Sequence, residues 1–130
     1  MTDQQVQTDI SNRPLPFAIV WGIPIAVLFS TNFTQAYLPP AVTLLTVAGA
    51  LAWMGLSCVI NAVRCGRLHC KFSGPIFLLG SGAILASGFG SLGSPGLFIN
   101  EILWGTVILA LSTYGLEWIW GPYGTGRKAR

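Results

Sequence analysis

Residues 41–63 read AVTLLTVAGALAWMGLSCVINAV, and this stretch decides the fold class because it contains no charged side chain. A helix of about 20 apolar residues spans the hydrocarbon core of a bilayer, which is roughly 30 Å thick. The whole chain has the same bias: 52% of its 130 residues are hydrophobic and 8% are charged, against about 25% charged in soluble domains. We therefore expect an integral membrane protein.

Three further segments have a similar length and composition. Their backbone polar groups must be satisfied within the segment when lipid surrounds it, and no strand-like alternation is present, so we expect helices. The breaks between segments are LPP at 38–40, RCGRLHCKFSG at 64–74 and SPG at 94–96. Such short connections make each helix antiparallel to the one before it. The sequence predicts an all-α bundle of four transmembrane helices, at about residues 17–37, 41–63, 75–93 and 97–120.

The seven basic residues all lie on one side of this arrangement, and none lies in the 38–40 or 94–96 turn. Cytoplasmic loops of membrane proteins carry an excess of Lys and Arg. We therefore expect a multi-pass protein of the bacterial inner (plasma) membrane with both termini inside: a polar cytoplasmic N-terminus (1–16), the membrane domain (17–120) and a basic cytoplasmic tail (121–130). The basic residues are Arg13, Arg64, Arg67, Lys71, Arg127, Lys128 and Arg130.

The first apolar segment also has a length that suits a signal peptide. However, residues 1–16 contain Asp3, Asp9 and a single Arg, where a signal peptide has a short basic stretch. We therefore expect this segment to remain as the first transmembrane helix.

Small residues recur at four-residue spacing in the third predicted span, at Gly82, Ala86 and Gly90. This spacing lets helix backbones approach closely, which matters because apolar burial drives little association between helices already in lipid. Two interpretations stay open: packing within the bundle, or a docking face for a partner membrane protein or a second copy of the chain.

Polar residues within the predicted spans are few. Charged groups there are costly and often functional. Glu101 falls in the first turn of the fourth span, where a carboxylate meets the favourable end of the helix dipole. Glu117 falls near the cytoplasmic end, within reach of Arg64 or Arg67. We expect both carboxylates to be interfacial anchors rather than parts of an ion pathway, and Asn61 to lie near the inner surface.

Residues 64–70, RCGRLHC, combine two cysteines with the only histidine of the chain. If the second helix continues past residue 63, Cys65 and His69 share a face, about 6 Å apart along the axis. Cys58 lies on that face about 10 Å deeper, too far to share one ion but suited to passing it on. Thiolate and imidazole ligands select Zn, Cu(I) or Hg(II). The motif predicts a metal site of Cys65, His69 and Cys70, with Cys58 as an intramembrane relay.

Two other interpretations of this loop stay open. In the first, Arg64, Arg67 and Lys71 only determine the orientation in the membrane, and the cysteines are small apolar residues that fill space at a helix interface. In the second interpretation the loop has a thiol redox role, although the reducing cytoplasm disfavours a permanent Cys65–Cys70 disulfide. The formal charge of +3 does not indicate a nucleic-acid partner, because the basic residues are few and scattered. Nothing resembles a hydrolase triad or nucleotide loop, so we do not expect an enzyme.

The stretch RCGRLHCKFSGPIFLL resembles a cytoplasmic loop, R-C-G-R-x-H-C-x-x-[ST]-G-P, found in small uncharacterised bacterial inner-membrane proteins. This resemblance covers roughly residues 61–79 and implies no particular activity. In layout the chain is also similar to mercuric-ion transport proteins, which use membrane and cytoplasmic cysteines. That analogy implies Cys58 as the membrane thiol and Cys65 with Cys70 as the cytoplasmic pair, although the first span lacks the vicinal cysteines typical of those transporters.

Three functions follow from these interpretations. The first is a small carrier or sensor of thiophilic metal ions that uses the Cys/His loop. The alternative is a non-catalytic accessory or assembly subunit of a larger membrane complex, docked through the third helix. The third is a partner in thiol–disulfide exchange.

Overall fold

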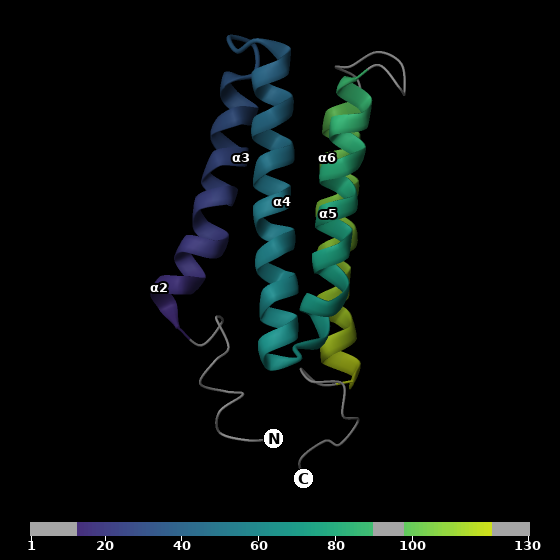
Figure 1. Cartoon of the computed structure of the whole chain (residues 1–130). Coiled ribbons are helices and arrows are strands. Elements are labelled where there is room, and N and C mark those ends of the chain that lie inside the picture. The colour runs from purple at the N-terminus through teal and green to yellow at the C-terminus, as the bar shows by residue number, and fades with distance from the viewer. Residues whose placement is uncertain (1–12, 90–97, 121–130) are drawn as a thin grey trace.

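The computed structural model describes residues 13–89 and 98–120, and over these residues it contains helices and no strand (Figure 1). Four helices are long and apolar enough to cross a membrane. The first is a continuous run of three pieces, and the others are single α-helices. In chain order the elements are α2 (Pro14–Phe17), the π-helical turn η2 (Ala18–Gly22), α3 (Ile23–Thr34), α4 (Pro40–Cys65), α5 (Leu68–Gly88) and α6 (Phe98–Trp120).

The observed helices agree with three of the predicted spans to within three residues at each end. The third span is different, because α5 begins at Leu68 rather than at Pro75, and Pro75 lies inside the helix. The reason lies in the preceding turn. Gly66 adopts a left-handed conformation (φ 70°) that ends α4, and Arg67 is extended and leads directly into α5. The predicted loop at 64–74 is therefore a tight turn, and most of its residues are helical.

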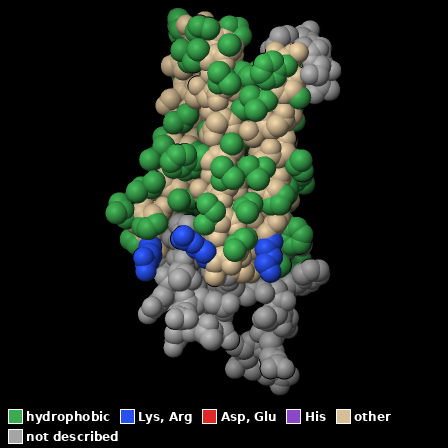
Figure 2. All heavy atoms as spheres, viewed as in Figure 1, with side chains coloured by type: hydrophobic (Ala, Val, Ile, Leu, Met, Phe, Trp, Pro, Cys, Tyr) green, Lys and Arg blue, Asp and Glu red, His purple; other side chains and the backbone are tan. Residues whose placement is uncertain are grey.

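The α4–α5 turn, the start of α2 and the end of α6 lie at the same end of the bundle (Figure 1). The described basic residues Arg13, Arg64, Arg67 and Lys71 belong to these segments. Figure 2 shows Lys and Arg side chains only at this end of the face in view, with apolar side chains over the rest. The predicted tail (121–130) and most of the predicted N-terminal segment lie outside the described residues.

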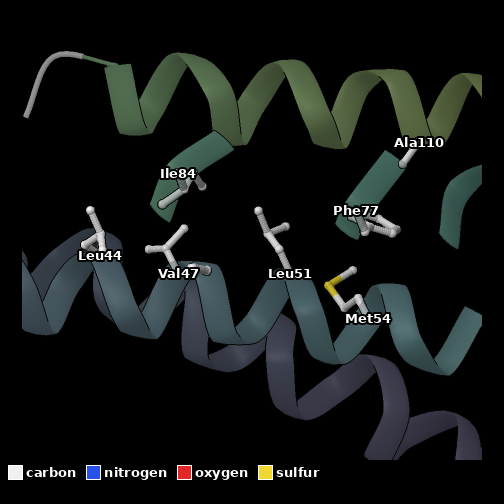
Figure 3. Packing of buried hydrophobic residues seen from close by; sticks show 8 residues of the cluster. Leu44, Val47, Leu51, Met54, Phe77, Ile84 and Ala110 are labelled. Carbon is white, nitrogen blue, oxygen red and sulfur yellow. The ribbon is translucent and has the colours of Figure 1, made fainter. Parts of the chain in front are cut away.

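The core lies along α4 and α5, and α6 packs against α5 (Figure 3). Leu51 and Ile84 have no exposed surface. Large apolar side chains also cover the outside of the bundle, including Trp53, Leu79 and Ile108. In water such a surface would be unfavourable. A surface of this kind fits the lipid environment that the composition predicts.

Close approach between the helices depends on glycines other than those that the sequence pattern indicated. A Cβ atom at Gly55 would lie 2.9 Å from the Leu78 side chain, and one at Gly80 would collide with Thr106. Gly82 is exposed, and a Cβ atom there would meet nothing within 4 Å. Of the two interpretations of Gly82, packing within the bundle therefore does not fit the structure, because its face of α5 points outward. Ala86 is half-buried, and Gly90 lies outside the described residues.

Candidate thiol centre at the α4–α5 turn

The turn at residues 66–67 places His69 and Cys70 in the first turn of α5, beside the last turns of α4. Both side chains are buried, with 2% and 3% of their surface exposed. Cys58 and Asn61 on α4 are equally buried, at 2% and 4%. The fold thus encloses two thiols, one imidazole and one carboxamide at the end of the bundle that carries the basic residues.

The sulfur of Cys70 is the centre of this group. His69 Nε2 lies 3.2 Å from Cys70 Sγ, and Asn61 Nδ2 donates to the same sulfur over 3.6 Å. The side chains of Cys58 and Cys70 line the same small cavity, and Cys58 also lies near Ser73. Cysteines twelve positions apart in the sequence therefore meet across the α4–α5 interface.

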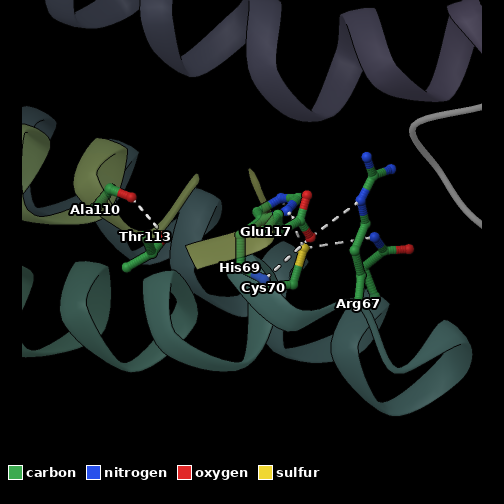
Figure 4. Close-up of polar contacts among 7 residues, drawn as sticks. Arg67, His69, Cys70, Ala110, Thr113 and Glu117 are labelled. Atoms are coloured by element: carbon green, nitrogen blue, oxygen red, sulfur yellow. Dashed lines mark hydrogen bonds and ion pairs between the residues drawn. The ribbon is translucent and has the colours of Figure 1, made fainter. Parts of the chain in front are cut away.

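Glu117 on α6 holds the imidazole from the opposite side (Figure 4). Its Oε1 atom accepts from the backbone N–H of His69 over 3.2 Å and lies 2.7 Å from His69 Nδ1. Arg67 Nε lies 3.5 Å from the same oxygen. The carboxylate therefore satisfies a free N–H at the start of α5, where the helix dipole also favours negative charge.

Two aromatic residues border the group. The Tyr114 ring stacks on the His69 ring, with centroids 4.2 Å apart and planes 21° apart. On the other side, Trp21 from η2 lines a small cavity of about 10 Å³ together with Cys58, Asn61 and Cys70. That volume matches roughly one water molecule.

The contacts define the chemistry of the group. An ionised Glu117 carboxylate only accepts hydrogen bonds, so His69 carries its proton on Nδ1 and directs the Nε2 lone pair at Cys70. Nε2 can then take the thiol proton, and Glu117 stabilises the resulting imidazolium. This order of thiol, imidazole and carboxylate is the arrangement that activates a thiol.

The described residues contain no group of three or more His, Cys, Asp or Glu side chains placed so that it could hold a metal ion. The sulfur and nitrogen atoms touch one another in a chain instead of surrounding a common point. A tetrahedral zinc site, which takes four ligands, therefore does not fit the described side chains as they stand.

The structure revises the predicted ligand set. Cys65 is the last residue of α4 and, since the helix stops there, it does not share a continuous helix face with His69; its side chain lies outside the description. Cys58 lies beside His69 and Cys70 around one small cavity, so it is not separate from the predicted ligands His69 and Cys70. Arg64 and Lys71 are exposed.

The sequence predicted some of the surroundings of Glu117 and Glu101. The expected approach of Glu117 to a basic residue is confirmed for Arg67. Glu101 is exposed in the first turn of α6, as expected. The bond from Asn61 to a sulfur was not expected.

Tyr114 and Ser73 are the members of the site that sequence reasoning missed. The sequence does contain a signal for the α6 side, because Thr106, Ala110, Thr113 and Glu117 are spaced four, three and four residues apart, and the structure buries the first three. Residues with this spacing share one face of a helix. No comparable signal was present for Ser73.

Comparison of the chain with protein-family models found no match, and neither a curated protein nor a solved structure matches it.

Proposed function

We propose that this protein carries or senses a thiophilic metal ion, which binds between the thiolates of Cys58 and Cys70. The observation that carries the proposal is that these two buried thiols, one from α4 and one from α5, line the same small cavity. An ion held there would join the two central helices, so that loading and release could alter how the helices pack.

The arrangement favours ions that accept two thiolate ligands. Soft sulfur ligands select Cu(I) and similar ions, and Cu(I) and Hg(II) both form stable complexes with two thiolates. Zinc needs more ligands than the described side chains offer together. The cargo proposed here is therefore Cu(I) or Hg(II) rather than Zn.

Binding requires the thiols to lose their protons, because the thiolate is the ligand. His69 Nε2, 3.2 Å from Cys70 Sγ, is placed to accept one of them, and the other leaves to water or to the ligand that delivers the ion. Glu117 and Arg67 then hold the charged imidazole in a network with alternating charges. Release of the ion would follow from the reverse transfer.

Burial helps to choose between an ion and a protein partner. With only 2% to 3% of Cys58 and Cys70 exposed, a thiol on another protein has no direct line of attack on either sulfur. Reactive cysteines in exchange proteins are partly exposed. A small ion needs far less room, which supports metal binding over thiol–disulfide exchange.

We further propose that the four apolar helices cross the bacterial inner membrane with both termini in the cytoplasm. The support is the common location of Arg13, Arg64, Arg67 and Lys71 at one end of the bundle (Figure 2). The thiol centre then lies at the cytoplasmic side, where glutathione and thioredoxin keep thiols reduced.

The test is an anaerobic titration of the reduced, detergent-purified protein with Cu(I) in the presence of a competing chelator. We expect one Cu(I) per chain in the wild type and in the Cys65→Ser control, and loss of this binding in Cys58→Ser and Cys70→Ser. Circular dichroism of each variant checks that the helices remain.

Two results would contradict the proposal. Unchanged binding in Cys58→Ser with Cys70→Ser would move the site elsewhere. A wild type that binds no ion but forms a Cys58–Cys70 disulfide under mild oxidation would favour the redox role instead.

A second candidate is an accessory subunit that docks a membrane partner or another copy of the chain through α5. It is favoured by the outward position of Gly82, where the surface is open and a second helix backbone could approach closely. Gly82→Leu should then abolish co-purification with the partner or formation of dimers, while Cu(I) binding stays intact. Unchanged assembly in Gly82→Leu would contradict this candidate.

A further inference from the structure

A cavity of about 590 Å³ lies at the opposite end of the bundle from the thiol centre. It is bordered by the end of α3, the start of α4, the end of α5 and the start of α6. Pockets for small molecules are typically about 300–1,000 Å³, and in bundles they form between helices. The volume is therefore that of a ligand site rather than of a packing defect.

The lining of this cavity has two chemical parts. Hydroxyl and carboxamide groups come from Thr31, Thr43, Asn32, Gln35 and Asn100. The remainder is largely aliphatic, from residues such as Leu28, Val47 and Leu103. A molecule that satisfies both parts has a polar head and a hydrocarbon tail.

The described lining contains no Asp, Glu, Lys, Arg or His. A phosphate or carboxylate head group would therefore enter without a cation to balance it, which is unfavourable in an apolar environment. The lining selects an uncharged head group.

Thr43 indicates that the head carries a hydrogen-bonding group. Its hydroxyl is buried and has no partner among the described residues, and the residue is 8% exposed. Thr31, on the facing helix, instead donates to the Val27 carbonyl over 2.7 Å. A buried hydroxyl left unpaired costs free energy, so a ligand oxygen that forms a hydrogen bond with Thr43 would be stabilised here.

We infer that this cavity binds an uncharged amphiphile with an oxygen-containing head group, which forms a hydrogen bond with the Thr43 hydroxyl while its hydrocarbon tail lies along Leu28, Val47 and Leu103. Prenylated quinones and diacylglycerols share this chemistry. The site is independent of the thiol centre, which lies at the other end of α5.

The test is native mass spectrometry of the full-length protein released from detergent, with decylubiquinone, dioleoylglycerol or dioleoylphosphatidylglycerol added in turn. We expect saturable 1:1 binding of at least one of the two uncharged probes, and weaker binding of the anionic lipid. The two uncharged probes distinguish a quinone from a glyceride.

Variants test the site itself. Thr43→Val keeps the side-chain size and should weaken binding roughly three- to tenfold, as expected for one lost hydrogen bond. Ala41→Phe projects into the cavity from an exposed position and should abolish binding. Thr46→Val, on the same helix but outside the lining, is the matched control. Cys58→Ser should bind the probe normally, which separates this site from the proposed metal site.

The inference is overturned if no uncharged probe binds saturably, if the anionic lipid binds as well as the tighter-binding uncharged probe, or if the wild type and Ala41→Phe bind that probe equally. Equal affinity of Thr43→Val and the wild type would overturn the assigned hydrogen bond.

Discussion

His69 Nδ1 lies 2.7 Å from Glu117 Oε1, and this contact joins the first turn of α5 to the last turns of α6. The same carboxylate oxygen accepts from the His69 backbone and pairs with Arg67. One acidic side chain therefore caps a helix, fixes the orientation of an imidazole and directs its free nitrogen at Cys70. The site depends on this link between helices that are distant in the sequence.

Replacing Glu117 by Gln should lower both stability and ion binding. Hydrogen bonds to charged groups contribute about 1.5–3 kcal/mol each, so we expect a loss of that order in the free energy of unfolding. Cu(I) should also bind more weakly, because the amide does not stabilise the imidazolium. Thermal unfolding in detergent and Cu(I) titration measure the two effects. Glu101→Gln, at an exposed position, is the control. Identical behaviour of both variants would show that the Glu117 contacts contribute nothing.

The same substitution at two glycines on α5 should have different effects on stability. A Cβ atom at Gly80 collides with Thr106, whereas one at Gly82 meets open space. Gly80→Val should therefore destabilise the bundle by about 1–3 kcal/mol, as overpacking usually does. Gly82→Val should leave the monomer nearly as stable as the wild type. The two variants are compared by their unfolding midpoints in the same detergent. An equal loss of stability in both would contradict the observed α5–α6 interface.

The turn at Gly66 should be sensitive to any Cβ atom. Its φ of 70° is left-handed, which costs a residue other than glycine about 1–2 kcal/mol. Gly66→Ala should lower stability by that amount. Gly49→Ala is the matched control, because that glycine is helical with free space around it, and it should gain about 0.5–1 kcal/mol. A Gly66→Ala protein as stable as the wild type would mean that the turn has another conformation.

Reporter fusions test the proposed orientation. Green fluorescent protein fused after residue 130 should fluoresce, because we propose that this end lies in the cytoplasm. Alkaline phosphatase inserted in the 38–40 turn should be active, because that turn is proposed to lie outside. The reverse pattern would contradict the positive-inside argument. A fusion within the α4–α5 turn tests independently whether that turn lies in the cytoplasm.

Span positions could be predicted from the sequence because apolar length alone determines them to within a few residues. The start of α5 could not, since Pro75 suggested the first turn of a helix. A proline is tolerated inside an apolar helix when neighbouring groups satisfy the freed carbonyl. The left-handed Gly66 then shortened the connection, which changed the positions of His69 and Cys70 relative to α4.

The residues of the candidate site were recognised more readily than their contacts. Cys58, His69, Cys70 and Glu117 all stood out as unusual residues in an apolar chain. Their meeting depends on the register between α4, α5 and α6, which is set by the fit of Gly55, Gly74 and Gly80 against the facing helices. A pattern within one helix contains no such information, so the sequence left open whether Gly82 packs within the bundle or faces a partner.

The central claim is that Cys58 and Cys70 together bind one soft ion, and the X-ray absorption spectrum of the Cu(I)-loaded protein tests it most directly. The account predicts a two-coordinate copper with sulfur neighbours only, in the wild type and in Cys65→Ser alike, and no bound copper in Cys58→Ser. A spectrum unchanged by Cys58→Ser, or one dominated by nitrogen and oxygen neighbours, would contradict it.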